Sequence, residues 1–324
     1  MIRNFTYVKA GSISEAIKAL AAKGVKLHAG GTDLMGCMRD EVFQVQKVVS
    51  ISGLKNLKGT SARPDGGMKI GALTTVADVA SSVSLAEKYA VLSQAAAEVA
   101  SPQLREQGTI GGNLCQRPRC WYFRGDFQCA RKGGDMCYAV DGENQYHAIF
   151  GGGPCFFVHP SDIAVALVAL QAQIVITGPA GSKAVRIESF FVSPDKNVEK
   201  ENILAQDEIV TEIHLPPLGG KVLSSYRKIR ARRAWDFALT SVGVVLQFEN
   251  EKISKARIVL GGVAPYPWRA TAAEKLLIGR KPDAELAAAA GQAAADGANP
   301  MRDNAYKVEM VKGAVEESVL ALRA

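Results

Sequence analysis

TIGGNLCQRPRCWYFRGDFQCARKGGDMCYAVDGENQYHAIFGGGPCFFVHPSD, residues 109–162, is the segment around which we expect the rest of the chain to be organised. It holds five of the six cysteines, interleaved with basic residues, aromatic residues and glycine. The cysteines are Cys115, Cys120, Cys129, Cys137 and Cys155, and the basic residues among them are Arg117, Arg119, Arg124, Arg131 and Lys132. Ligation of a metal centre is the simplest physical reason to gather so many thiols in one segment. We therefore expect a thiolate-ligated centre here.

The 324 residues, 48% of them apolar, are enough for two or three domains with substantial cores. No run of about 18 apolar residues predicts a membrane span, and the first residues lack the apolar core of a signal peptide. We expect a soluble, cytoplasmic protein, or a periplasmic one if a partner chain carries an export signal. Six cysteines in a reducing compartment indicate metal or redox use rather than a disulfide framework.

The net charge of +7 is spread along the chain, and no motif that reads a nucleic-acid groove is present. We therefore expect the positive charge to face anionic cofactors or an acidic partner subunit, and we expect no nucleic acid to bind.

Two glycine pairs carry the second chemical signal. A predicted strand at 26–29 leads into Gly30-Gly31-Thr32-Asp33-Leu34, and Thr109-Ile110-Gly111-Gly112-Asn113 repeats the pattern. Consecutive glycines let the backbone turn tightly and direct its N–H groups at one point, which suits a diphosphate. The first motif alone is equally consistent with a plain turn. Two such motifs in one domain favour a phosphate-binding site.

Hydrophobic periodicity predicts a mixed α+β chain. The expected strands are 5–8, 26–29, 48–51, 68–72, 173–175, 187–191, 209–215, 222–227, 240–248 and 253–260. The expected helices are 12–23, a run from 76, an alanine-rich helix at 84–99 ending near Ser101-Pro102, 163–170, 271–279, 283–297 and 301–322. The Pro/Gly cluster at 216–220 predicts a domain boundary.

Four sequence motifs, including the two glycine pairs, together resemble a known family. AGGTDL at 29–34, TIGGN at 109–113, HPSD at 159–162 and Lys228 followed by Asp236-Phe237-Ala238 are similar to the FAD-binding medium subunit of the molybdenum hydroxylases. That family includes xanthine dehydrogenases, carbon monoxide dehydrogenase, aldehyde oxidoreductases and 4-hydroxybenzoyl-CoA reductase. The Cys-rich insertion, residues 115–158, resembles members whose flavin subunit also carries a [4Fe-4S] cluster, namely bacterial aldehyde oxidoreductases and 4-hydroxybenzoyl-CoA reductase.

The resemblance implies a fold and a set of FAD ligands. The implied fold is an α+β, two-part FAD-binding domain of the vanillyl-alcohol-oxidase/PCMH type at 1–217, with subdomains at about 1–55 and 56–217, and a smaller α+β domain at 218–324. The implied FAD-binding residues are Ala29, Gly30, Gly31, Thr32, Asp33, Leu34, Thr109, Gly111, Gly112, Asn113, Asp162 and Lys228.

Asp162 and Lys228 have particular expected roles in that set. Asp162 is expected to accept hydrogen bonds from FAD hydroxyls, unless it only caps the following helix. Lys228 is expected beside the isoalloxazine ring, where a cation stabilises the reduced anion. Arg230, Arg232 and Arg233 follow Lys228, and the alternative to a place beside the flavin or at a partner interface is a solvated loop.

For the cluster, the resemblance implies Cys120, Cys129, Cys137 and Cys155 as ligands. Eight, seven and seventeen residues separate them, which is too irregular for a zinc ribbon but acceptable for loops around an iron–sulfur cube. A structural zinc site and reduced free thiols stay open as alternatives. Cys115 is left out of the ligand set because it lies two residues after Asn113, and Cys37 is expected to be a buried small apolar residue.

The remaining length contains no cysteine set for [2Fe-2S] clusters and no room for a molybdopterin-binding domain. We therefore expect an electron-transfer subunit, with molybdopterin on a large partner and [2Fe-2S] on a small partner, in a heterotrimer or a dimer of heterotrimers. An external electron donor or acceptor is also expected. The alternatives are a stand-alone flavoprotein oxidase and a nucleic-acid-binding zinc protein.

Overall fold

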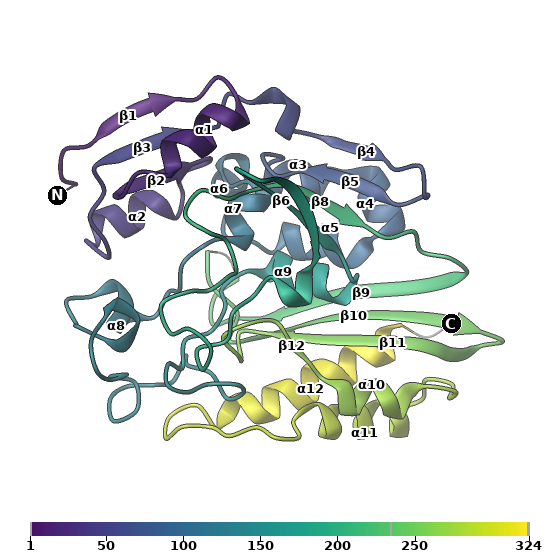
Figure 1. The fold of residues 1–324 in the computed structure, drawn as a ribbon. Helices are drawn as coiled ribbons and strands as arrows, with labels where there is room; N and C mark the ends of the chain where they lie inside the picture. Colours follow the sequence, from purple (N-terminus) through teal and green to yellow (C-terminus); the bar gives the residue numbers. More distant parts are fainter. Residues whose placement is uncertain (1, 234, 323–324) are drawn as a thin grey trace.

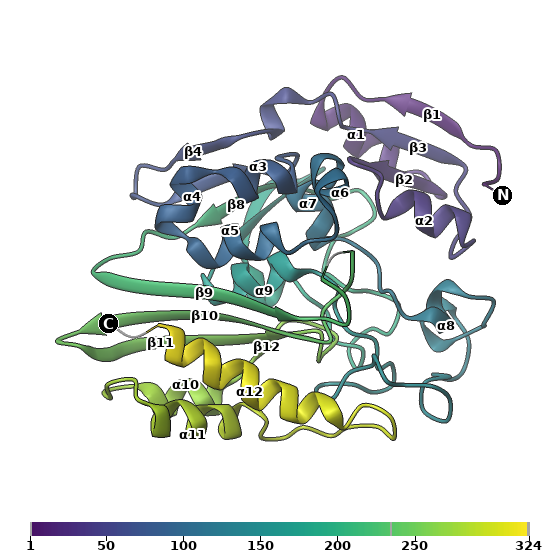
Figure 2. The same cartoon turned by 180° about the vertical axis from the view of Figure 1, so that it is seen from behind.

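The computed structural model describes residues 2–233 and 235–322. Three β-sheets lie in successive layers, and three C-terminal helices form a further layer at one end (Figure 1). The Cys-rich insertion lies on the side of the molecule where the N-terminus lies and the last helix begins, opposite the C-terminal end (Figures 1 and 2).

The N-terminal layer is a parallel sheet in the order β1-β3-β2. Its strands are β1 (Thr6–Lys9), β2 (Val25–His28) and β3 (Lys47–Ser50), and its helices are α1 (Ile13–Leu20) and α2 (Leu34–Arg39). Helix α1 begins where the Ser12 hydroxyl accepts a hydrogen bond from the Glu15 N–H, and its face of Ala16, Ile17 and Leu20 is buried on the sheet.

The second layer is a five-stranded antiparallel sheet in the order β4-β5-β8-β6-β7. Its strands are β4 (Thr60–Ala62), β5 (Met68–Gly71), β6 (Gln173–Gly178), β7 (Gly181–Arg186) and β8 (Ile209–Leu215). The helices between them are α3 (Val76–Ser81), α4 (Val83–Lys88), α5 (Ala90–Ala97), α6 (Pro102–Gln107), α7 (Ile110–Leu114), α8 (Trp121–Arg124) and α9 (Asp162–Ala169). All residues of α9 are buried, because this helix packs between other elements on every side.

The third layer is an antiparallel sheet in the order β12-β11-β10-β9. Its elements are β9 (Lys221–Ile229), β10 (Thr240–Glu249), β11 (Lys252–Gly261) and β12 (Trp268–Arg269), covered by α10 (Thr271–Leu277), α11 (Ala284–Ala294) and α12 (Tyr306–Ala321). Val242, Val244 and Leu246 alternate into the core shared with these helices, whereas Val245 belongs to the core shared with α5 and α9. The third sheet is therefore buried on both faces.

Three expectations about secondary structure are wrong. The helix expected at 84–99 is broken at Tyr89, which leaves the helical conformation and whose buried side chain donates a hydrogen bond to the Pro216 carbonyl at 2.8 Å. Ser101 and Pro102 begin a helix, α6, instead of ending one, since the Ser101 hydroxyl accepts from the Leu104 N–H and proline at the first helical position sacrifices no hydrogen bond. The strand expected at 187–191 lies earlier, at β7, and is followed by the 3-10 turn Ile187–Ser189.

Across the described residues, we find no helix that combines the length and the apolar character needed to cross a membrane.

Candidate functional site

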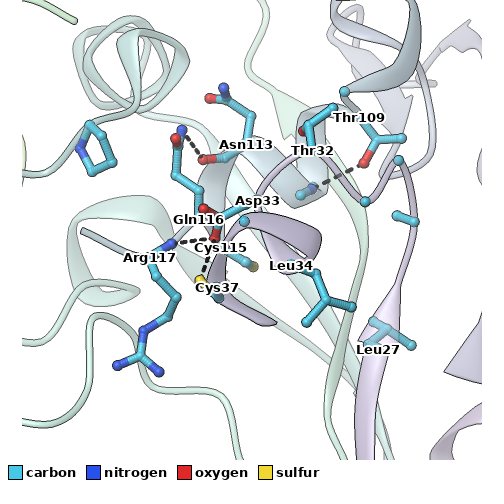
Figure 3. Close-up of a pocket in the computed structure, with 18 of the residues that line it drawn as sticks. Leu27, Thr32, Asp33, Leu34, Cys37, Thr109, Asn113, Cys115, Gln116 and Arg117 are labelled. Atoms are coloured by element: carbon cyan, nitrogen blue, oxygen red, sulfur yellow. Dashed lines mark hydrogen bonds between the residues drawn. The ribbon is translucent and has the colours of Figure 1, made fainter. Parts of the chain in front are cut away.

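A cavity of about 1290 Å³ is enclosed by α2 and the turn before it, the segment from α6 to α7, and side chains from α9 and β9. Twelve residues in its wall are those expected from the sequence to bind FAD: Ala29, Gly30, Gly31, Thr32, Asp33, Leu34, Thr109, Gly111, Gly112, Asn113, Asp162 and Lys228. Figure 3 shows Thr32 lying beside Thr109 and Asn113, which come from the other glycine motif. The structure therefore brings residues from distant parts of the chain to one cavity.

The first glycine motif packs backbone to backbone against the segment that precedes the second. A Cβ atom on Gly30 would overlap the carbonyl oxygen of Gln107, and Gly31 has a φ of +74°, which disfavours any other residue. None of the described residues accepts a hydrogen bond from the N–H groups of Gly30, Gly31 or Thr32. These donors remain available to a ligand. Helix α2, which follows this turn, was not predicted from the sequence.

The second glycine motif differs from the expected turn, because it forms the short helix α7. The N–H groups of Gly111 and Asn113 donate to the carbonyls of Ala72 and Thr109 at 2.9 and 2.8 Å, and the Gly112 N–H donates to the Thr109 hydroxyl at 3.2 Å. These backbone donors are already used within the protein. What the glycines provide at the cavity wall is a surface without side chains.

Asp162 and Lys228 form a buried ion pair in the cavity wall. Lys228 Nζ lies 2.8 Å from Asp162 Oδ2 and also donates to the Glu98 carbonyl at 3.1 Å. The Tyr226 hydroxyl donates to Asp162 Oδ1 at 2.5 Å. Burial raises the pKa of Asp162, and the Lys228 charge opposes this rise. The sequence reading missed Tyr226, although it lies two residues before Lys228 on one strand and must therefore share its face.

The side chain that caps helix α9 is that of Ser161, so Asp162 does not have the capping role that was its alternative. The Ser161 hydroxyl accepts from the Ala164 N–H at 2.9 Å and donates to Asn113 Oδ1 at 2.5 Å. Both carboxylate oxygens of Asp162 are thus left to Tyr226 and Lys228.

Asp33 lies in the cavity wall, but its carboxylate is directed at the Cys-rich insertion. It accepts from the Arg117 N–H at 2.8 Å and from Arg124 Nη2 at 2.7 Å, and it pairs with Arg119 Nη2 at 2.8 Å. Figure 3 shows the first of these contacts. No feature of the linear sequence near Asp33 indicated this role, because its partners lie more than eighty residues away.

The four cysteines expected as cluster ligands all lie in the irregular insertion. Cys120 Sγ is 3.3 Å from His147 Nε2. A hydrogen bond between Cys137 and Cys155 lowers the pKa of the first thiol and raises that of the second, whereas burial raises the pKa of Cys120 to about 11. Cys129 is buried. Within the described part of the chain, no three His, Cys, Asp or Glu side chains come together closely enough to hold a single metal ion.

The other two cysteines lie in the wall of the large cavity. Burial raises the pKa of Cys115 to about 12 and that of Cys37 to about 11, so both are protonated thiols near neutral pH. Cys37 is fully buried, which agrees with the small apolar role expected for it.

Comparison with known proteins defines the class. Residues 3–218 match the family described as the FAD binding domain in molybdopterin dehydrogenase, and residues 224–322 match the CO dehydrogenase flavoprotein C-terminal domain. The chain therefore belongs to the FAD-binding flavoprotein subunits of the molybdenum hydroxylase family of oxidoreductases.

Individual relatives cover almost the whole chain. The aldehyde oxidoreductase FAD-binding subunit PaoB of Escherichia coli K12 is 36% identical over 330 residues, covering 99% of this chain and 98% of PaoB. The glyceraldehyde dehydrogenase medium chain of Sulfolobus acidocaldarius is 28% identical over 95% of this chain and 94% of its own length. A solved structure of carbon monoxide dehydrogenase from Hydrogenophaga pseudoflava superposes with a TM-score of 0.79 at 26% identity, covering 100% of both chains.

These findings confirm the expected α+β fold, with an FAD-binding domain followed by the C-terminal domain of the family, and they confirm FAD as the cofactor class. The family descriptions name FAD and no iron–sulfur cluster, so membership of the [4Fe-4S] type stays a prediction.

Proposed function

We propose that this chain is the electron-transfer subunit of a multi-subunit molybdenum-containing oxidoreductase and holds FAD in the large cavity. The observation that carries the proposal is the backbone contact between the Gly30 turn and the segment leading into Thr109, which opens both glycine motifs onto one cavity. FAD, when bound, exchanges one electron with iron–sulfur centres and two with organic molecules.

We assign separate tasks to the residues around the cavity. The available N–H groups of Gly30, Gly31 and Thr32 bind the FAD diphosphate, and the bare surface of Gly111 and Gly112 lets the cofactor approach α7 closely. Ala29, Leu34, Thr109 and Asn113 complete the wall along the diphosphate and ribityl chain.

Asp162 and Lys228 belong to the end of the cavity that holds the isoalloxazine ring in this proposal. The Lys228 side chain is 1% exposed, so its charge acts in a poorly solvated environment. The positive end of the ion pair stabilises negative charge on a reduced flavin, while Asp162 holds the ammonium in place.

Substrate chemistry belongs to partner subunits in this proposal. The relatives are named as an FAD-binding subunit and as a medium chain. The related carbon monoxide dehydrogenase structure is described as lacking the Mo-pyranopterin moiety of the molybdenum cofactor, so that enzyme is one that uses this cofactor. We infer a large molybdopterin subunit and a small [2Fe-2S] subunit, assembled as a heterotrimer or a dimer of heterotrimers. An external electron donor or acceptor completes the path.

We further propose that Cys120, Cys129, Cys137 and Cys155 ligate a [4Fe-4S] cluster. Each of the four irons takes one thiolate, so the four sulfur atoms surround the cluster and need not converge on one point as they do around zinc. In support, Cys137 and Cys155 are already in contact, and the thiols of Cys129 and Cys137 lie near enough to Cys120 to raise its pKa. The buried Arg131 places a positive charge near Cys155, which offsets cluster charge.

A cofactor analysis of the purified complex tests both assignments. We expect flavin absorbance with roughly four irons and four labile sulfides per FAD in this chain. Cys129→Ser is expected to lose the iron and keep the FAD, whereas the matched variant Cys115→Ser keeps both. Zinc in place of iron after anaerobic preparation, or full iron in Cys129→Ser, would refute the cluster. Oxidase activity of the isolated chain with an alcohol or aldehyde would instead favour a stand-alone flavoprotein oxidase.

A further inference from the structure

The Asp33 carboxylate joins the first glycine motif to the Cys-rich insertion. Asp33 directly follows Thr32 of the cavity turn, and its side chain is 17% exposed. All three of its insertion donors come from residues 117–124, at distances of 2.7 to 2.8 Å. A shift of the turn therefore moves the acceptor on which this part of the insertion is anchored.

Arg124 connects Asp33 to the segment around Cys120 through hydrogen bonds. Its Nη2 donates to Asp33 at 2.7 Å, its Nε donates to the Pro118 carbonyl at 2.8 Å, and its backbone N–H donates to the Cys120 carbonyl at 2.9 Å. The Arg124 side chain is only 12% exposed, so these contacts are largely shielded from water. The path from Thr32 to Cys120 is thus continuous and short.

Positive charge is crowded at one point of this junction, although Asp40 Oδ2 also lies 3.9 Å from Arg124 Nη1. Two guanidinium groups, those of Arg119 and Arg124, share one Asp33 carboxylate oxygen. Both arginines line the large cavity, and Arg119 Nε is buried with no hydrogen-bond partner among the described residues. An anionic dinucleotide in the cavity lowers the repulsion between the two cations. Binding of the dinucleotide therefore favours the arrangement in which both arginines form ion pairs with Asp33.

We propose that Asp33 is a positioning residue that couples FAD occupancy to the order of residues 116–124. FAD stabilises this segment, and by reciprocity an ordered segment tightens FAD binding. The inference rests on the proposed FAD site, and it assigns Asp33 a role other than direct contact with the cofactor.

Hydrogen exchange measured by mass spectrometry on the complex, with FAD removed and then restored, tests the coupling. In wild type, FAD is expected to slow exchange in 116–124 at least about fivefold. In Asp33→Asn this FAD-dependent protection is expected to be lost, although flavin absorbance shows that FAD still binds. Asp40→Asn is the matched control, because Asp40 lies at the end of the same helix and its carboxylate is 3.9 Å from Arg124.

Arg124→Lys provides a second variant should Asp33→Asn fail to fold, and it is expected to lose the protection in the same way. The inference is overturned if Asp33→Asn keeps full FAD-dependent protection. It is also overturned if exchange in Asp33→Asn is faster than in wild type by the same factor with and without FAD, because a residue that only stabilises the segment would have that effect. A wild-type complex that takes up no FAD would overturn the cavity assignment itself, and the absorbance spectrum separates that result from a failure of coupling.

Discussion

Replacement of Lys228 by methionine removes the cation that pairs with Asp162 inside the cavity wall. The side chains of Lys228 and Asp162 are 1% and 6% exposed. Breaking a buried ion pair on one side costs about 3–5 kcal/mol, because the remaining charge stays desolvated without a partner. For a chain of 324 residues, with an unfolding entropy of about 2.1 cal/mol/K per residue, we expect Lys228→Met to lower the Tm by roughly 4–7 °C at pH 8.

The loss should depend on pH in a definite direction. Burial already holds the pKa of Asp162 above its ordinary value, and Lys228 opposes that rise, so the variant has a still higher pKa. A carboxyl group whose pKa is higher in the folded state binds more protons when folded, and stability then falls as the pH rises towards that pKa. Lys228→Met should therefore be closest to wild type at pH 5 and lose most at pH 8.

Differential scanning calorimetry at pH 5 to 8, with FAD absent and saturating, measures these differences. Asp162→Asn/Lys228→Met should recover much of the loss at pH 8, since no buried charge is left unpaired. Lys281→Met is the matched control, because its pair with Glu251 is exposed, with side chains 60% and 71% accessible, and we expect a much smaller change in Tm. A double variant no more stable than Lys228→Met, or a loss equal at pH 5 and pH 8, would refute the reasoning.

Two further predictions concern the glycine turn and the C-terminal helix. Gly30→Ala should weaken FAD binding at least about tenfold in a fluorescence titration, because a Cβ atom at this position meets the Gln107 carbonyl. Gly36→Ala in α2 is the control and should bind FAD normally, since its Cβ atom would have only Arg124 Nη1 nearby, at 3.6 Å. Equal affinities of the two variants would contradict the close contact at Gly30. Lys307 is fully buried and donates to the carbonyls of Tyr146, His147 and Gly262, and burial lowers its pKa to about 7. Between pH 7 and 9, the unfolded state binds more protons at Lys307 than the folded state does. The free energy of unfolding of the wild type, relative to that of Lys307→Met, should therefore rise by up to about 1.4 kcal/mol per pH unit in urea unfolding. A difference that stays constant with pH would show that the Lys307 ammonium is not desolvated.

Short-range patterns account for the parts of the fold that sequence reasoning predicted well. The nearly continuous apolar runs of β10 and α9 follow directly from their burial on every side. Local patterns failed where a distant partner acts. Tyr89 interrupts an alanine-rich helix while its hydroxyl reaches the Pro216 carbonyl, a contact across 127 positions of the chain.

The candidate site divides along the same line. The two glycine motifs predicted a phosphate-binding site, because consecutive glycines direct backbone N–H groups within a few neighbouring residues. FAD and the family were implied by the resemblance of these motifs, the HPSD segment and Lys228 to a known family, and the family matches confirm both. Only the tertiary structure shows that the α7 donors are used internally, that Tyr226 holds Asp162, and that Asp33 faces the insertion. Those facts depend on which of several hydrogen-bonding partners lies nearest in space, and no local pattern encodes that choice.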